Sequence, residues 1–282
     1  MRATTALEQQ LRWLRWLQNS SAGLLDWRRQ RVDFAEQALK TAETYYWAKP
    51  VMDIINEVVH DMPNNWQFRM DRLPSERGFF WFEDPLLIAN DDAATHHVQS
   101  VVWSSGISEQ SGQAAINMTA FVEPLDSALP AHLVSTIFQE GDQIEDVISD
   151  IGRQPTAQVS KVAGVCAVCT LACCLSFLEQ KILVSPGQSA ERHVRRRLER
   201  QGFDHEPVVR VVELRRKQAK SDHAGEHEAV DWSHQWIVSG HWRQQWHPSL
   251  NTHQPRWIMP YVKGPEDKPL KPPRAKVFAV VR

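Results

Sequence analysis

The N-terminal region places apolar residues three or four positions apart, for example at Leu7, Leu11 and Leu14. Such spacing lines up one face of a helix and predicts amphipathic helices. Three segments show it: residues 6–18, 24–47 and 51–59. We therefore predict a helical N-terminal region over residues 1–62. Trp13 and Trp16 of the first helix either pack between helices or form a surface for a partner or a second copy of the chain.

After Pro63 the pattern changes to short apolar runs bounded by Gly, Pro, Asn and Asp. Runs of this kind are typical of β-strands. Three strands are predicted here: residues 78–88, 96–106 and 114–124. Residues 133–152 return to helical spacing. Together with the apolar helix that follows, this part is predicted to form an α+β domain over residues 63–188.

The apolar helix, predicted over residues 162–180, contains VAGVCAVCTLACCLSFL, which is 17 residues without a charge. A membrane span needs about 20 residues, so we favour a buried central helix over a membrane helix. Cys166, Cys169 and Cys173 share one of its faces. A structural zinc site usually draws its ligands from two separated pairs, and the chain has no second pair. We therefore interpret these cysteines as small apolar side chains and expect no metal or cofactor.

Residues 189–203, SAERHVRRRLERQGF, predict a short helix that is unusually basic. Five arginines lie within about two turns: Arg192, Arg195, Arg196, Arg197 and Arg200. Their aliphatic stems could cover apolar surface while their guanidinium groups pair with carboxylates of the same chain. Alternatively, the guanidinium groups could contact the phosphates of a nucleic acid.

The rest of the chain predicts a basic C-terminal domain over residues 189–282, built as an antiparallel sheet or a small open barrel. Its predicted strands are residues 208–217, 232–247, 256–264 and 275–282. If residues 232–247 are extended through Gly240, their side chains alternate between two faces. One face then collects four tryptophans that would form a core: Trp232, Trp236, Trp242 and Trp246. The other face carries a polar row: His241, Arg243, Gln245 and His247.

Charge is divided unevenly along a chain whose net charge is only −2. Residues 76–160 carry 13 acidic and 2 basic side chains, a net charge of −11. Residues 190–282 carry 18 basic and 11 acidic side chains, a net charge of +7. The basic region could therefore face a polyanion, or it could face the acidic region of the same chain.

The polar row allows three interpretations. It is a solvated sheet face, or a nucleic-acid surface to which Arg256 and Lys263 also contribute, or a metal-independent nuclease site. In the nuclease, His241 and His247 would act as general acid and base, and Arg243 or Lys263 would stabilise the phosphorane. Common cofactor motifs, such as a phosphate-binding loop or a dinucleotide fingerprint, are not present in the sequence.

Three stretches carry a family resemblance: LPSERGFFWFEDPLL, WSHQWIVSGHWRQQWHPS and RWIMPYVKGPEDKPLK. They resemble a family of uncharacterised proteins of actinobacteria, their phages and their mobile elements. The resemblance spans most of the chain after about residue 70 and transfers no catalytic residue. It implies the cytoplasmic protein of a phage or mobile element, a setting in which nucleic-acid handling, toxins and interference with host machinery are expected.

These patterns predict an α+β protein with N-terminal helices, an acidic β-containing middle, a buried Cys-rich helix and a basic β-rich C-terminal domain. The clustered cysteines and the absence of an apolar leader favour the cytoplasm. Our leading hypothesis is a non-enzymatic protein that binds nucleic acid through its basic C-terminal domain. The alternatives are a module that binds a host or competing-phage protein, and a ribonuclease-like toxin.

Overall fold

The computed structural model describes residues 2–20, 26–90, 93–108, 111–124, 132–154, 158–179, 186–203, 207–213, 236–238, 240–258 and 261–265. The chain forms two compact units, unit 1 (Met1–Arg216) and unit 2 (Lys217–Arg282). Unit 1 contains a seven-stranded sheet, and unit 2 contains two two-stranded sheets. No closed barrel is present among the described strands. The α+β class predicted from the sequence is therefore confirmed.

The large sheet is mixed, with the strand order β5-β4-β3-β2-β1-β7-β6. β1 runs parallel to both of its neighbours, β2 and β7, and the remaining pairs are antiparallel. The strands are β1 (Glu43–Trp47), β2 (Arg77–Asn90), β3 (Ala93–Ile107), β4 (Ala114–Pro124), β5 (His132–Gln139), β6 (Gln188–Ser189) and β7 (Val208–Val212).

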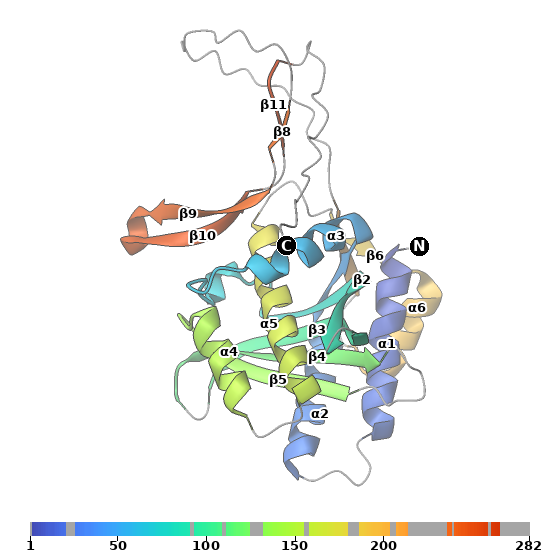
Figure 1. The fold of residues 1–282 in the computed structure, drawn as a ribbon. Helices are drawn as coiled ribbons and strands as arrows, with labels where there is room; N and C mark the ends of the chain where they lie inside the picture. Colours follow the sequence, from blue (N-terminus) through green and yellow to red (C-terminus); the bar gives the residue numbers. More distant parts are fainter. Residues whose placement is uncertain are drawn as a thin grey trace. The chain divides into compact units, whose positions relative to one another are not determined.

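Helices cover both faces of this sheet (Figure 1). The first face carries α1 (Arg2–Ser20), α2 (Asp26–Thr41) and α6 (Arg192–Arg200). The second face carries α3 (Lys49–Val58), α4 (Ile144–Arg153) and α5 (Gln158–Leu178). Two 3₁₀ turns connect elements, η1 (Val59–Asp61) and η2 (Met70–Arg72).

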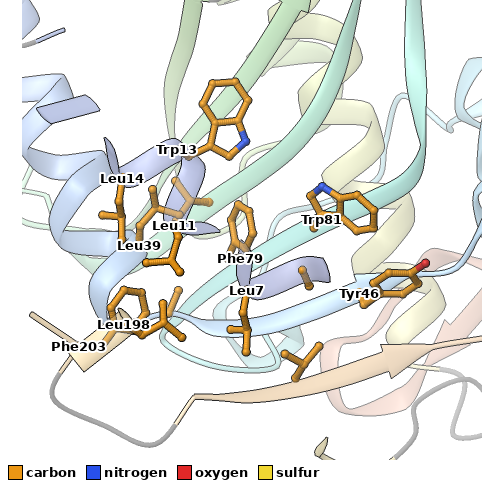
Figure 2. Packing of buried hydrophobic residues seen from close by; sticks show 14 of the residues in the cluster. Leu7, Leu11, Trp13, Leu14, Leu39, Tyr46, Phe79, Trp81, Leu198 and Phe203 are labelled. Atoms are coloured by element: carbon orange, nitrogen blue, oxygen red, sulfur yellow. The ribbon is translucent and has the colours of Figure 1, made fainter. Parts of the chain in front are cut away.

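The first core layer lies between α1, α2, α6 and the sheet, as Figure 2 shows. Leu7 and Leu11 of α1 are fully buried there against Phe79 of β2. Leu198 of α6 enters the same cluster. Trp13 is also buried at 1% exposure and packs in this layer, whereas Trp16 is only partly buried against it.

The second core layer is aromatic. Tyr45, Phe80 and Trp103 form edge-to-face and tilted contacts with ring centroids 4.5–6.2 Å apart. Trp66 is anchored to α5 because its indole N–H donates to Ser176 Oγ at 2.8 Å. Satisfying a buried indole in this way avoids the cost of a lost hydrogen bond.

α5 is the predicted Cys-rich helix, and its burial is confirmed. By length and composition alone, Lys161–Leu178 could cross a membrane, with a mean hydropathy of 2.0. Within the structure, however, 72% of that window is buried, and α5 packs on β2, β3, β4 and β5. The central helix of a protein core meets the same criteria of length and composition.

The helical prediction for residues 24–47 is wrong over its last part. α2 ends at Thr41, and Glu43–Trp47 form β1 in the interior of the sheet. Four of the five residues of β1 are buried, because helices cover both faces of a parallel strand. A short apolar run of this kind cannot be distinguished from a buried helical turn by periodicity.

The helical prediction for residues 133–152 is also wrong in its first half. β5 forms the edge of the sheet, and the chain then turns at Gly141, whose φ is +89°. α4 begins only at Ile144. The glycine adopts the left-handed conformation that other residues rarely adopt, so it ends the strand and allows the helix to start.

The basic C-terminal region does not begin a new structural unit at residue 189. β6, α6 and β7 all belong to unit 1. β7 pairs in parallel with β1 in the interior of the large sheet. The predicted strand 208–217 is therefore part of the large sheet over Val208–Val212. The predicted strand 275–282 lies outside the described residues.

An ion-pair network ties the acidic middle of the chain to α1. Glu123 of β4 accepts a hydrogen bond from Arg12 at Oε1, and its Oε2 lies 3.3 Å from Nε2 of His97 on β3. Hydrogen bonding to His97, followed by the charge of Arg12, holds the pKa of Glu123 below its ordinary value. Desolvation opposes this effect but does not outweigh it.

Replacing Gly78 tests the close approach of β2 to the second core layer. A Cβ at Gly78 would lie 1.9 Å from Cζ2 of Trp103, which is itself fully buried. We expect Gly78→Ala to lower the free energy of unfolding by about 3 kcal/mol in urea denaturation, because neither ring nor strand can move away. The matched control is Gly106→Ala on β3, where a Cβ would meet nothing within 4 Å. Equal stabilities of the two variants would contradict this packing.

Replacing Glu123 tests the ion-pair network. A carboxylate with a depressed folded-state pKa stabilises the protein above its ordinary pKa, and this stabilisation is lost as pH falls through the folded-state pKa. We expect wild-type stability to decrease below about pH 4.5, and Glu123→Gln to show a shallower decrease in thermal denaturation over pH 3–6. Glu145→Gln, at an exposed position of α4, should retain the wild-type slope. If Glu123→Gln loses stability with falling pH as steeply as the wild-type protein, the network is not the source of that pH dependence.

Candidate nucleic-acid interface

The polar row of the sequence lies on a β-hairpin in unit 2. β9 (His241–His247) and β10 (Thr252–Ile258) pair antiparallel, and η3 (Pro248–Leu250) forms the turn. Asn251 closes the turn with φ +50°, a conformation that asparagine tolerates better than most residues. Four cross-strand pairs share the face of the polar row: His241 with Ile258, Arg243 with Arg256, Gln245 with Gln254, and His247 with Thr252.

Arg243 and Arg256 are directly opposite each other on that face. Like charges at such positions destabilise a strand pair by roughly 0.2–1 kcal/mol. Arg256 donates to Gln245 Oε1 at 3.4 Å, an amide that neutralises neither charge. Among the described residues, no ion pair involves Arg243. The sequence predicted that both arginines contact phosphate, and the structure brings them together.

The two strands of the hairpin differ in exposure. On β10, Gln254 and Trp257 are buried at 4% and 2% exposure, although they lie on opposite faces. On β9, His241 and Arg243 are exposed. No described strand pairs with the outer edge of β9. Of the candidate residues on this hairpin, His241 and Arg243 are therefore exposed, whereas His247 and Arg256 are only partly exposed.

The opposite face of the hairpin is aromatic but only partly a core. Trp242 and Trp257 form an edge-to-face pair with ring centroids 5.4 Å apart. Nearer the turn, Trp246 pairs with His253 at 5.0 Å, and Trp246 remains 45% exposed. The expectation of a tryptophan core is therefore wrong at Trp246. Of the other two tryptophans, Trp232 and the side chain of Trp236 lie outside the described residues.

The arginines of α6 separate into two groups in unit 1. Val194 and Leu198 are buried against the sheet layer, Arg195 is partly covered, and Arg197 pairs with Glu8 of α1 at 3.4 Å. On the solvent side, three exposed arginines lie four positions apart: Arg192, Arg196 and Arg200. This spacing aligns them along one face of the helix, about 6 Å apart along its axis. Pairing with a carboxylate of the same chain is therefore observed for Arg197, and phosphate contact stays a prediction for the exposed arginines.

The ion pairs of the acidic and basic regions lead to the N-terminal helices. In the acidic segment, Glu123 pairs with Arg12 of α1 and Asp84 pairs with Lys49 of α3. In the basic segment, Arg197 pairs with Glu8 of α1. The two regions therefore use the N-terminal region as a shared partner, and the arginine row of α6 remains exposed.

The geometry of β9 does not suit a nuclease pair. His241 and His247 share a face but are six residues apart, which is about 20 Å along an extended strand. A general acid and a general base must each reach hydrogen-bond distance of the same reacting phosphate. Lys263 lies in β11 (Tyr261–Lys263), which pairs with β8 (Trp236–Val238) in a separate two-stranded sheet.

A cavity of about 210 Å³ lies in unit 1 between η1, α4 and α5 and is lined in part by Cys166, Cys169 and His60. Burial raises the pKa of Cys169 to about 12, which disfavours the reactive thiolate. Among the described residues, no group of three or more His, Cys, Asp or Glu side chains is placed to hold a metal ion.

Comparisons with known proteins include a similar solved structure. No protein-family model matches the chain, and no curated protein matches it. The crystal structure of AcrVA2 is similar over 92% of this chain and 93% of that chain, with 13% sequence identity and a TM-score of 0.42. Because this TM-score is below 0.5, we base the function on the residues of the chain itself.

Proposed function

We propose that the protein binds nucleic acid through two basic surfaces, one in each unit, and that it does so without catalysing a reaction. The observation that carries the proposal is the facing pair Arg243 and Arg256 on the β9–β10 hairpin. A cross-strand pair of cations is unfavourable in the free protein and becomes favourable when an anion lies over it. A phosphate backbone supplies such anions at regular intervals.

The exposed arginine row of α6 supports the same function from unit 1. α6 packs on the rest of unit 1 through the buried side chains of Val194 and Leu198. Its exposed side carries Arg192, Arg196 and Arg200. Guanidinium groups bind phosphate in a bidentate manner. Binding without catalysis fits the wide separation of His241 and His247 on β9. We propose the cytoplasm of a phage-bearing or mobile-element-bearing cell as the setting.

A second candidate function is binding to a host or competing-phage protein. It is favoured by the edge strand β5, where Ile137 is 57% exposed. α4 follows β5 in the chain, lies on the sheet face opposite to Ile137, and exposes three carboxylates, Glu145, Asp146 and Asp150, of which Asp150 pairs with Arg153. Edge strands recruit extended peptides by strand addition, and the carboxylates would favour a basic one.

The proposed function is tested by the salt dependence of binding. We expect the full-length protein to bind DNA and RNA oligonucleotides in fluorescence anisotropy, with an affinity that decreases steeply as salt rises. Arg243→Gln and Arg256→Gln should each weaken binding and make the slope of log affinity against log salt shallower by about one, since each removes about one phosphate contact.

The same binding measurement tests the exposed arginines of α6. Arg192→Gln, Arg196→Gln and Arg200→Gln should each reduce the slope in the same way. The matched control is Arg153→Gln on α4, an exposed arginine beside carboxylates, which should leave affinity and slope unchanged. Absence of binding at low salt, or an equal effect of Arg153→Gln, would overturn the proposal.

The second candidate function is tested by charge reversal on α4. The double variant Glu145→Lys/Asp146→Lys should lose a basic protein partner that the wild-type protein retains after nuclease treatment of a host lysate. Its binding to oligonucleotides should not decrease, because α4 is not part of the basic surfaces. Retention of the same partner by the variant would exclude the β5–α4 surface as its binding site.

A further inference from the structure

The tip of the β9–β10 hairpin presents an aromatic side chain that the proposed phosphate contacts do not use. Trp246 and His253 form the pair next to the end of the hairpin, with ring centroids 5.0 Å apart and ring planes inclined by 56°. Trp246 is 45% exposed, whereas Trp257 on the same face is 2% exposed. Indole rings are usually buried when a core is available to them, so the tip leaves a large apolar ring surface accessible.

This ring lies beside the cationic pair along the same strand. Arg243 and Trp246 are three residues apart on β9, which is about 10 Å along an extended strand. Their side chains project to opposite faces of the hairpin. Both are accessible at the outer edge of β9, where no described strand pairs. A flexible chain that follows this edge can contact a guanidinium group on one side and an indole ring on the other.

From this arrangement we propose, on the basis of the proposed function, that the ligand is a single-stranded nucleic acid and that Trp246 stacks on one of its unpaired bases. A base inside a duplex has both of its faces covered by neighbouring bases and presents only its edges in the grooves. An unpaired base presents a free face to an aromatic ring. An exposed indole next to phosphate-binding arginines therefore favours a single strand over a duplex.

His253 positions the indole for this contact. Its ring packs against Trp246 from the neighbouring strand and limits the rotation of the indole. A ring held in place loses less conformational freedom when a base stacks on it. His253 is thus a positioning residue, and the contact surface belongs to Trp246.

The experiment compares three oligonucleotides of equal length at one salt concentration: a single strand of mixed sequence, a single strand of abasic sites, and a duplex. All three are first made as DNA and titrated with the full-length protein. The base-bearing single strand and the duplex are then tested again as RNA. We expect wild-type protein to prefer the base-bearing single strand over both the abasic strand and the duplex. Trp246→Ala should weaken binding of the base-bearing strand roughly ten-fold and leave binding of the abasic strand unchanged.

Two further variants separate stacking from folding and from charge. Trp246→Phe keeps an aromatic face and should retain most of the affinity that Trp246→Ala loses. Arg243→Gln should weaken the binding of all three oligonucleotides, because each of them carries phosphates. Circular dichroism of each variant verifies the fold.

The failure of this inference is distinguishable from the failure of the proposed function. If the protein binds none of the oligonucleotides, the proposed function is wrong and the stacking contact falls with it. If binding persists and depends on Arg243, but Trp246→Ala binds the base-bearing strand as tightly as wild type, only the stacking contact is overturned. Preference for the duplex with the same arginine dependence would place the hairpin in a groove of double-stranded nucleic acid and would also overturn it.

Discussion

The structure of unit 1 depends on the burial of β1. This five-residue strand lies between β2 and β7 and runs parallel to both. A parallel strand needs helices on each of its faces, because its side chains point alternately to both. Tyr46 enters the layer beneath α1, α2 and α6, and Tyr45 enters the aromatic layer on the other side. The N-terminal helices, the acidic middle and the start of the basic region therefore belong to one compact unit.

That arrangement determines which basic side chains are available for binding. α6 is held against α1 by buried Val194 and Leu198, and this fixes the direction of its remaining side chains. Arg197 is directed back to Glu8, whereas Arg196 is exposed. The arginines of this helix thus divide into a structural group and a solvent-facing row. The solvent-facing row is the part of α6 that can serve a polyanion.

The hairpin of unit 2 also has buried side chains and exposed ones. Its strand β10 is buried at Gln254 and Trp257, and its strand β9 exposes Arg243 and Trp246. Because side chains alternate along β9, Arg243 and Trp246 project to opposite faces. They are nevertheless only three residues apart on the strand. In the function proposed above, phosphate contacts would supply affinity that depends on salt, and a stacking ring would supply a preference for unpaired bases. The two kinds of contact would act on different chemical parts of the same ligand.

Local patterns in the sequence determined the elements whose periodicity is long and regular, such as α1, α5 and the strands β2, β3 and β4, together with the alternation that puts Arg243 on the face opposite Trp246. Tertiary structure alone decided the rest. Glu43–Trp47 became a strand because β2 and β7 supplied partners for its backbone, and no local pattern encodes partners far along the chain. For the same reason α6 joined unit 1, through the pairing of β7 with β1. The facing of Arg243 and Arg256 and the exposure of Trp246 beside His253 depend on the register of two strands, which the turn at Pro248–Leu250 sets.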